Sequence, residues 1–216
     1  MVRSASELTN LVREIGFLPM FNSSIAGFSL AELTPADHWF VEGVEGPWEW
    51  REALAASGEF AYGKLFERKA GFIHRSILKK FINLRRDGYD FDARYEDSLA
   101  SERAKRIIDL LTAEGSMHSS EIRRRAHIEK GFDGALTQLQ MQTYLTILSF
   151  DYKTNKYGEV YGFGTGRYGL TEEKFGADFV AAAYEEPPED SIAGLVCRLK
   201  EIAPQIDEET ARKFLA

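Results

Sequence analysis

Apolar residues recur with a helical period through the middle of the chain. From Ser101 to Gly115 they occupy one helix face at i, i+3, i+4 and i+7, namely Ala104, Ile107, Ile108 and Leu111. Ser101 can cap the start of this helix and Gly115 can end it. A second, short helix is expected over Ser120–Ala126 behind a Ser119 cap, with Ile122 inward and three mostly solvated arginines, Arg123, Arg124 and Arg125.

A third helix is expected to begin near Phe132, after a turn at Glu129–Gly131. At about 100° per residue, one of its sides carries a stripe of residues suited to burial: Phe132, Ala135, Leu136, Leu139 and Thr143. The opposite half carries Asp133, Gly134, Thr137, Gln138, Met141 and Tyr144, with Gln140 and Gln142 on the two shoulders. We therefore expect this opposite half to face solvent.

An extended pattern follows the third helix. TILSFDY is rich in residues that favour strands, KTNKYGE supplies turn residues, and VYGFGTGRYGL resumes the extended pattern. Two strands joined by a turn bearing lysines are typical of a wing. The order of elements predicts a winged helix-turn-helix, in which the third helix leaves its outer side free for a DNA groove.

The flanking regions complete an α+β fold that is mainly helical. Residues 1–97 form an N-terminal α+β region, residues 98–176 the winged-helix domain, and residues 177–216 acidic helices that pack on the body or pair with a second copy as a homodimer. Within the first region, the tryptophans of Gly43–Trp50 alternate as in a strand. A hairpin is expected around the basic turn Glu67-Arg68-Lys69.

A basic helix is expected after that hairpin. It runs from Ile77 to Arg85 behind a Ser76 cap. Its apolar positions Ile77, Phe81 and Leu84 should face inward, whereas Lys79, Lys80 and Arg86 should point outward. A basic hairpin tip followed by a basic helix suits contact with phosphates, although a solvated surface with no partner would have the same composition.

Charge is distributed unevenly along the chain. The net charge is -7, which argues against a nonspecific DNA coat. From Lys64 to Arg86, however, eight basic residues stand against one acid, whereas residues 1–63 and 177–216 are both acidic. This distribution is expected if only the middle of the chain faces a polyanion.

Composition excludes several classes of protein. A hydrophobic content of 44% indicates a globular chain. Apolar runs are far shorter than a membrane span, and the N-terminus lacks a secretory segment, so we expect a cytoplasmic protein without membrane contact. Cys197 is the sole cysteine and the four histidines have no ligand spacing, so neither a disulfide, a metal site nor a cofactor is expected.

Two short motifs match known signatures only in part. The segment Arg86–Asp92 is rich in aspartate, but Arg94 and Tyr95 stand where a calcium loop needs a ligand and a glycine. A linker whose aspartates cap neighbouring helices is the preferred interpretation. The glycines of Gly164–Gly169 match the dinucleotide-binding pattern by letter, but they do not open a βαβ unit. They are interpreted as giving the wing flexibility or a close backbone approach.

A family resemblance rests on several of these segments. The run from Ile107 through Leu170, with GPWEW and RRDGYDFDARYEDSLAS, resembles bacterial proteins related to the AlkZ-type winged-helix DNA glycosylases. The resemblance implies tandem winged helices, removal of alkylated or crosslinked bases, and a catalytic motif of Gln, an apolar residue, then Gln or Asp. Gln138-Leu139-Gln140 and Gln140-Met141-Gln142 match this motif by letter.

Three hypotheses on function follow. In the first, the chain binds double-stranded DNA without chemistry of its own: Thr137, Gln138 and Met141 read the groove, and basic residues hold phosphates or lie beside them (Arg68, Lys69, Lys79, Arg123, Arg124, Arg125, Lys130, Lys153, Lys156). In the second, it is a DNA glycosylase in which Gln140 and Gln142 position water. In the third, its wing and acidic tail bind another polypeptide.

Overall fold

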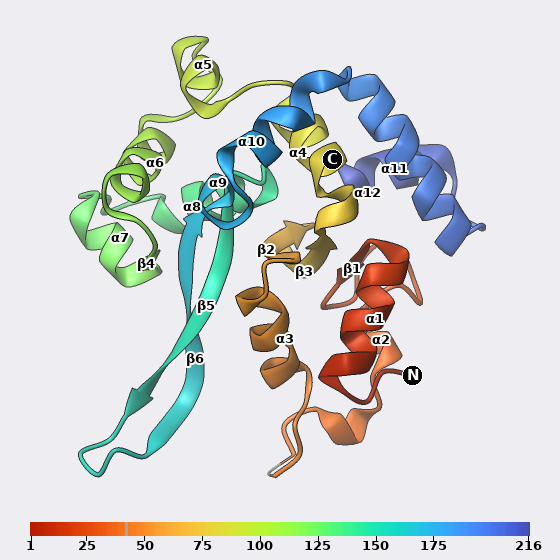
Figure 1. The fold of residues 1–216 in the computed structure, drawn as a ribbon, viewed down its shortest axis with the longest axis vertical. Coiled ribbons are helices and arrows are strands. Elements are labelled where there is room, and N and C mark those ends of the chain that lie inside the picture. The colour runs from red at the N-terminus through yellow and green to blue at the C-terminus, as the bar shows by residue number, and fades with distance from the viewer. Residues whose placement is uncertain (42) are drawn as a thin grey trace.

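The computed structural model describes residues 1–41 and 43–216 (Figure 1). The protein is α+β, and the described residues form mostly helices together with two antiparallel three-stranded sheets, of strand order β1-β3-β2 and β4-β6-β5. The predicted fold class is therefore confirmed at this level. Among the described residues, none of the helices combines the length and apolar character that crossing a bilayer requires.

The first sheet and its helices come from the N-terminal part. In chain order the elements are α1 (Ala5–Ile15), β1 (Phe17–Pro19), α2 (Leu30–Leu33), a 3-10 turn (Ala36–His38), α3 (Pro47–Ala56), β2 (Phe60–Phe66), β3 (Lys69–His74) and α4 (Arg75–Arg86). Glu67 and Arg68 connect β2 to β3 with φ values of 47° and 63°. Two positive φ values in a hairpin turn match the twist of the two strands that it joins. The hairpin predicted here is therefore present.

The segment around the two tryptophans is a helix, so the predicted strand was wrong. Pro47 occupies the first turn of α3, where a proline costs no hydrogen bond. The Glu49 carboxylate accepts a hydrogen bond from the Gly46 amide at 2.8 Å and so caps the same end. These local interactions favour a helix over the strand that the alternation of Trp48 and Trp50 indicated.

The middle of the chain folds largely as its periodicity predicted. Its elements are α5 (Phe91–Glu96), α6 (Glu102–Glu114), β4 (Met117–His118), α7 (Ser119–Arg125), α8 (Phe132–Met141), β5 (Leu145–Thr154) and β6 (Val160–Leu170). The Asp90 carboxylate caps α5, as expected of an aspartate in this linker. Strands β5 and β6 form a long hairpin that extends away from the helices (Figure 1).

The C-terminal helices cover the N-terminal part. They comprise α9 (Thr171–Phe175), α10 (Ala177–Ala181), a 3-10 turn (Ala182–Glu185), α11 (Pro188–Ile202) and α12 (Glu208–Leu215). Helix α11 packs against α4 and α12, and Phe214 of α12 stacks on Phe66 of β2 with ring centroids 5.3 Å apart. Their apolar residues thus belong to the same core as β1–β3, whereas a second core lies among α5–α8.

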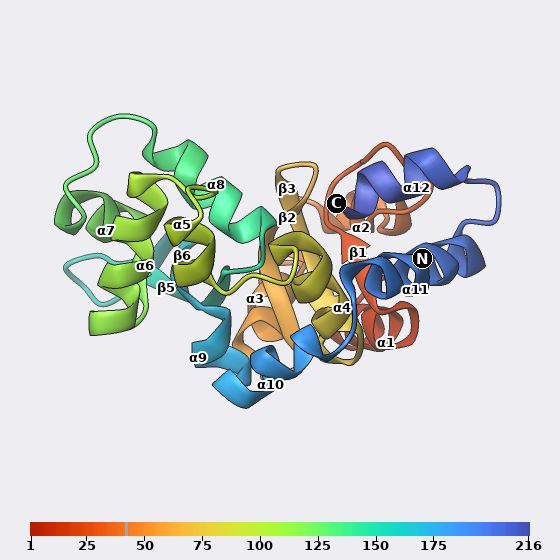
Figure 2. The same cartoon turned by 90° about the horizontal axis from the view of Figure 1, so that it is seen from above.

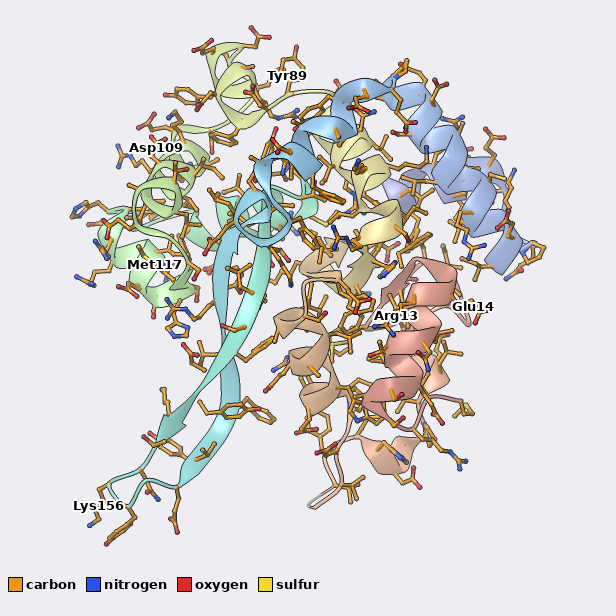
Figure 3. The ribbon with its side chains drawn as sticks, in the orientation of Figure 1. Arg13, Glu14, Tyr89, Asp109, Met117 and Lys156 are labelled. Atoms are coloured by element: carbon orange, nitrogen blue, oxygen red, sulfur yellow. The ribbon has the colours of Figure 1, made fainter. Side chains whose placement is uncertain are left out.

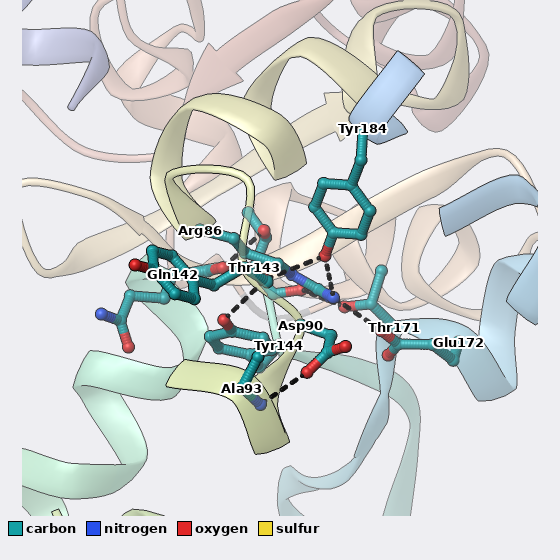
Figure 4. A network of polar contacts seen from close by, with 10 residues as sticks. Arg86, Asp90, Ala93, Gln142, Thr143, Tyr144, Thr171, Glu172 and Tyr184 are labelled. Carbon is teal, nitrogen blue, oxygen red and sulfur yellow. Dashed lines mark hydrogen bonds and ion pairs between the residues drawn. The ribbon is translucent and has the colours of Figure 1, made fainter. Parts of the chain in front are cut away.

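Arg86 joins these two parts of the molecule. Its guanidinium donates to the Glu172 carboxylate at 2.6 Å, to the Thr143 carbonyl at 2.8 Å and to the Tyr184 hydroxyl at 3.1 Å (Figure 4). It also lies 4.2 Å from the ring centroid of Tyr144. Because its side chain is 1% exposed, the expectation that Arg86 points into solvent was wrong. The last turn of α4 faces the second core, so a charged residue there is buried.

Arg85 makes a similar connection on the other side of α4. Its Nε donates to the Leu215 carbonyl at 3.0 Å and its Nη1 to the Met141 carbonyl at 3.3 Å. The guanidinium also lies near the rings of Phe66 and Phe81. Two of the eight basic residues in the Lys64–Arg86 segment therefore stabilise the fold. Their guanidinium groups are buried and cannot contact a polyanion.

Candidate nucleic-acid interface

Helix α8 has three kinds of surface instead of the two predicted. One is buried in the second core, one is exposed to solvent, and one is covered by the N-terminal sheet. Phe132, Leu136 and Leu139 are buried in the second core, as the periodicity indicated. On the opposite half, Gln138 is exposed, but Thr137 is only 4% exposed. We predicted that Thr137 would face solvent beside Gln138. That prediction was wrong because the N-terminal sheet covers this part of the helix.

The covering strand is β2, which is the edge of the N-terminal sheet. An edge strand has main-chain groups that need partners from outside the sheet. The Lys64 amide donates to Gln140 Oε1 at 2.9 Å, and the Tyr62 amide donates to Thr146 Oγ1 at 3.1 Å. The Thr146 hydroxyl in turn donates to the Tyr62 carbonyl at 3.0 Å. Side chains of α8 and β5 thus provide hydrogen-bond partners for main-chain groups at the edge of β2.

Gln140 is fully engaged in this contact. Its Nε2 donates to the Leu136 carbonyl at 3.0 Å, and the residue is 1% exposed. Gly63 allows the close approach, because a Cβ built there would lie 3.0 Å from Gln140 Oε1. Gln142, the second glutamine of the expected motif, follows α8 as its C-cap and is partly exposed (Figure 4). The two glutamines therefore lie in different environments and not around one pocket.

The β2–β3 turn lies at the C-terminal end of α8. The Arg68 amide donates to Met141 Sδ at 3.4 Å, and Lys64 Nζ donates to Thr137 Oγ1 at 3.3 Å. Lys69 Nζ donates to the Asn22 carbonyl at 2.7 Å. Lys64, Arg68 and Lys69 all remain exposed. This hairpin therefore carries three exposed cations near its turn, and the turn partly covers the Met141 side chain that was expected to read a groove.

The α7–α8 connection lies at the N-terminal end of the same helix. Arg123 and Arg124 in the last turn of α7 and Lys130 in the connection are exposed, and Arg123 Nη2 lies 3.2 Å from Asp133 Oδ2. Arg125 instead pairs with Glu114 and Glu121. A hollow of about 570 Å³ lies next to the connection, lined by Glu102, Arg103, Arg106, His127, Ile128, Glu129 and Lys130.

These elements combine into what we call the basic face. It consists of the α7–α8 connection, the exposed edge of α8 with Gln138, and the β2–β3 turn, which lie along one edge of the molecule in Figure 2. Its exposed cations are Lys64, Arg68, Lys69, Arg123, Arg124 and Lys130, and its acids are Glu67, Glu129 and Asp133. Six positive and three negative charges give this face a net charge of +3, in a chain of net charge -7.

The remaining predicted contact residues lie elsewhere. Lys153 and Lys156 are exposed near the far end of the β5–β6 hairpin, where Figure 3 labels Lys156. Lys79 lies on α4 with its ammonium 5.2 Å from the ring centroid of Phe179. The structure therefore brings the α7–α8 cations and the β2–β3 turn to one helix, but it does not bring the hairpin lysines or Lys79 there.

Sequence reasoning missed the residues that hold this interface together. The role of Gln140 and Thr146 depends on β2 being an edge strand, which no local pattern reveals. Arg103 and Arg106 were not among the predicted contact residues, although they line the hollow beside Lys130. Their helical phase relative to Ile107 indicates that they are exposed, but not that they lie next to the α7–α8 connection.

Fold and site together define an α+β protein with a basic face along one edge of a helix. The chain belongs to the AlkZ-related family, whose model matches residues 2–216. The predicted relationship is therefore confirmed at the level of the family. Neither the curated proteins nor the solved structures contain a match to this chain.

Proposed function

We propose that this protein binds double-stranded DNA through its basic face and acts in DNA repair, with residues 101–176 arranged as a winged helix-turn-helix. Membership of the AlkZ-related family supports the repair role. The order α6, α7, α8, then the β5–β6 hairpin with β4 as a third strand, supports the winged helix. In this arrangement α8 is the helix that approaches a groove.

One observation carries the proposal. Two basic segments that are far apart in the sequence, the β2–β3 turn and the α7–α8 connection, lie at opposite ends of α8. Gln138 is the exposed polar side chain between them. Cations at both ends suit the phosphates on either side of a groove, and a glutamine amide can pair with the edge of adenine. The lysines of the hairpin extend the proposed contacts beyond this face.

Salt dependence of duplex binding tests this proposal. Each phosphate contact that is removed lowers the slope of log K against log salt concentration by about 1. Arg124→Ala and Arg68→Ala should each weaken binding to all duplexes and reduce the slope by about this amount. Gln138→Ala should change the preference among duplex sequences and leave the slope unchanged.

Arg3→Ala is the matched control, because it removes one exposed arginine at the start of α1, remote from α8. It should leave both affinity and slope unchanged. Equal slopes for all four variants and the unmodified protein, or undetectable duplex binding at low salt, would contradict the proposal.

Family membership also favours a second function, excision of alkylated or crosslinked bases. Gln142 is then the glutamine with an exposed portion, since both polar atoms of the Gln140 amide already have partners. Incubation with alkylated duplex followed by alkali should produce strand breaks at abasic sites, and Gln142→Ala should abolish them. Intact strands across a panel of alkylated and crosslinked duplexes would exclude this function.

A further inference from the structure

Most exposed apolar side chains come from two segments of the chain. Eight of the ten large hydrophobic residues that are exposed in the described chain come from two segments, the connection before α3 and the β5–β6 hairpin: Phe40, Val41, Val44, Tyr152, Tyr157, Val160, Tyr161 and Phe163. Contiguous exposed apolar surface marks interaction sites in folded proteins, and the rings of Phe40 and Phe163 bring the two segments into contact. The two segments lie next to each other although more than a hundred residues separate them.

Three rings form the centre of this surface, which we call the aromatic patch. Phe40, Trp48 and Phe163 have ring centroids 5.6, 5.9 and 6.5 Å apart in pairs. Phe40 is 71% exposed and Phe163 is 69% exposed. Trp48 lies between them and the body, where it contacts Trp39 and Phe21. Two large rings are thus exposed on top of partly buried aromatic residues.

The backbone is shaped to present these rings. Phe40 has a φ of 58°, a left-handed conformation that is costly for a bulky residue and is concentrated at functional sites. On the hairpin, a Cβ built at Gly164 would lie 2.9 Å from Glu52 Oε1. Gly164 therefore lets β6 approach α3, and the Tyr152 hydroxyl donates to the same Glu52 carboxylate. The hairpin is held against α3 with Phe163 in place.

Charge around the aromatic patch selects the kind of partner. Among the described residues next to Trp48 in the sequence, the exposed charged side chains are the carboxylates Glu45 and Glu49, whereas the hairpin carries exposed charges of both signs. Arg51, the cation in this stretch, is buried with its guanidinium 4.5 Å from the ring centroids of both Trp48 and Phe150. Carboxylates beside the rings repel phosphates, so this side is unsuited to nucleic acid. They attract lysine and arginine.

We propose that the aromatic patch is a docking surface for a segment of another protein that presents apolar side chains next to lysine or arginine. The apolar side chains of the partner pack on Phe40 and Phe163, and its cations pair with Glu45 and Glu49. Aromatic anchors of this kind dominate binding energy at interfaces. The three rings lie outside the basic face, so the cations at the two ends of α8 remain accessible to duplex DNA while this partner is bound, although the patch shares its hairpin with Lys153 and Lys156.

Fluorescence anisotropy with a labelled amphipathic leucine–lysine peptide tests the proposal, against a leucine–glutamate peptide of the same pattern. The first peptide should bind at least about tenfold more tightly than the second. Phe163→Ser should weaken binding of the leucine–lysine peptide by at least about tenfold, as expected for an aromatic anchor. Glu45→Lys should weaken it as well and improve binding of the leucine–glutamate peptide.

Two control variants make the experiment specific. Leu99→Ser removes a side chain that is 52% exposed but lies on the α5–α6 connection. Glu189→Lys reverses an exposed charge on α11. Both should bind the peptides as the unmodified protein does. Because Phe163 and Glu45 are exposed, their substitution should leave the urea midpoint unchanged, which confirms that the variants are folded.

Several results would overturn the proposal. Equal affinity of the unmodified protein and Phe163→Ser for the leucine–lysine peptide is one, and equal affinity for the two peptides is another. Loss of duplex DNA binding in Phe163→Ser would assign the patch to nucleic acid. Self-association of the protein that Phe163→Ser abolishes would assign it to a second copy. Failure of Arg124→Ala to affect DNA binding concerns only the basic face and leaves this inference unaffected.

Discussion

Replacing Arg86 by methionine should destabilise the protein more than any change to an exposed arginine. Methionine keeps much of the side chain's length but removes every donor and the positive charge. The change breaks the hydrogen bonds to Glu172, Thr143 and Tyr184 that connect α4 to α9, the segment between α8 and β5, and the turn before α11. It also removes the cation over the Tyr144 ring.

The expected magnitude follows from the burial of these groups. Removing one partner of a buried ion pair costs roughly 3–5 kcal/mol. The Glu172 side chain is 34% exposed, so water can solvate it after the change. The Thr143 carbonyl also keeps a hydrogen bond from the Thr171 hydroxyl. Both facts place the loss near the lower limit, about 3 kcal/mol, a large part of the roughly 5–15 kcal/mol typical of folded proteins.

Urea unfolding followed by circular dichroism measures this loss. With a denaturant dependence of about 3 kcal/mol/M, the midpoint should fall by about 1 M. Arg86→Lys should recover part of the loss, because an ammonium keeps the charge but donates to fewer of these acceptors. Arg75→Met, at an exposed position of the same helix, should cost less than about 1 kcal/mol. A loss below about 1 kcal/mol for Arg86→Met would refute the reasoning.

Two further predictions concern buried polar groups. Burial lowers the pKa of Lys174 to about 8, so the unfolded chain binds more protons between pH 8 and 10.5. The free energy of unfolding, relative to that of Lys174→Met, should therefore rise across this pH window by up to about 3 kcal/mol. A difference between the two proteins in urea unfolding that does not change with pH would contradict this. Gln140→Ala leaves the Lys64 amide without its acceptor and should lower the free energy of unfolding by about 1–3 kcal/mol. Duplex affinity should be retained. Unchanged stability in the same assay would show that the contact is unimportant.

Local patterns predicted those elements that local interactions determine. The spacing of Ala104, Ile107, Ile108 and Leu111, with the Ser101 cap, sufficed for α6. The glycine and serine positions likewise placed α7 and α8 within a few residues. The alternation of Trp48 and Trp50 predicted a strand that is absent, because Pro47 and Glu49 favour the start of a helix at this place.

Contacts between distant segments could not be predicted from such local patterns. Arg86 was expected in solvent because the apolar positions of its helix were taken to face inward on the other side, yet the residues that surround it come from segments 143–184. The basic character of the β2–β3 turn and of the α7–α8 connection was visible in the sequence. Their common position beside α8 depends on the edge of β2 meeting Gln140 and Thr146, and such a meeting has no signature in either segment alone.

Amide chemical shifts recorded while short duplex DNA is added test the central claim most directly, because they report which surface DNA contacts. We predict changes in the β2–β3 turn, in the α7–α8 connection and at Gln138, with further changes at the hairpin lysines. The amides of α11, which lies outside the basic face, should stay unchanged. Changes confined to α11 and α12, or a basic face that does not respond to duplex at low salt, would contradict the account.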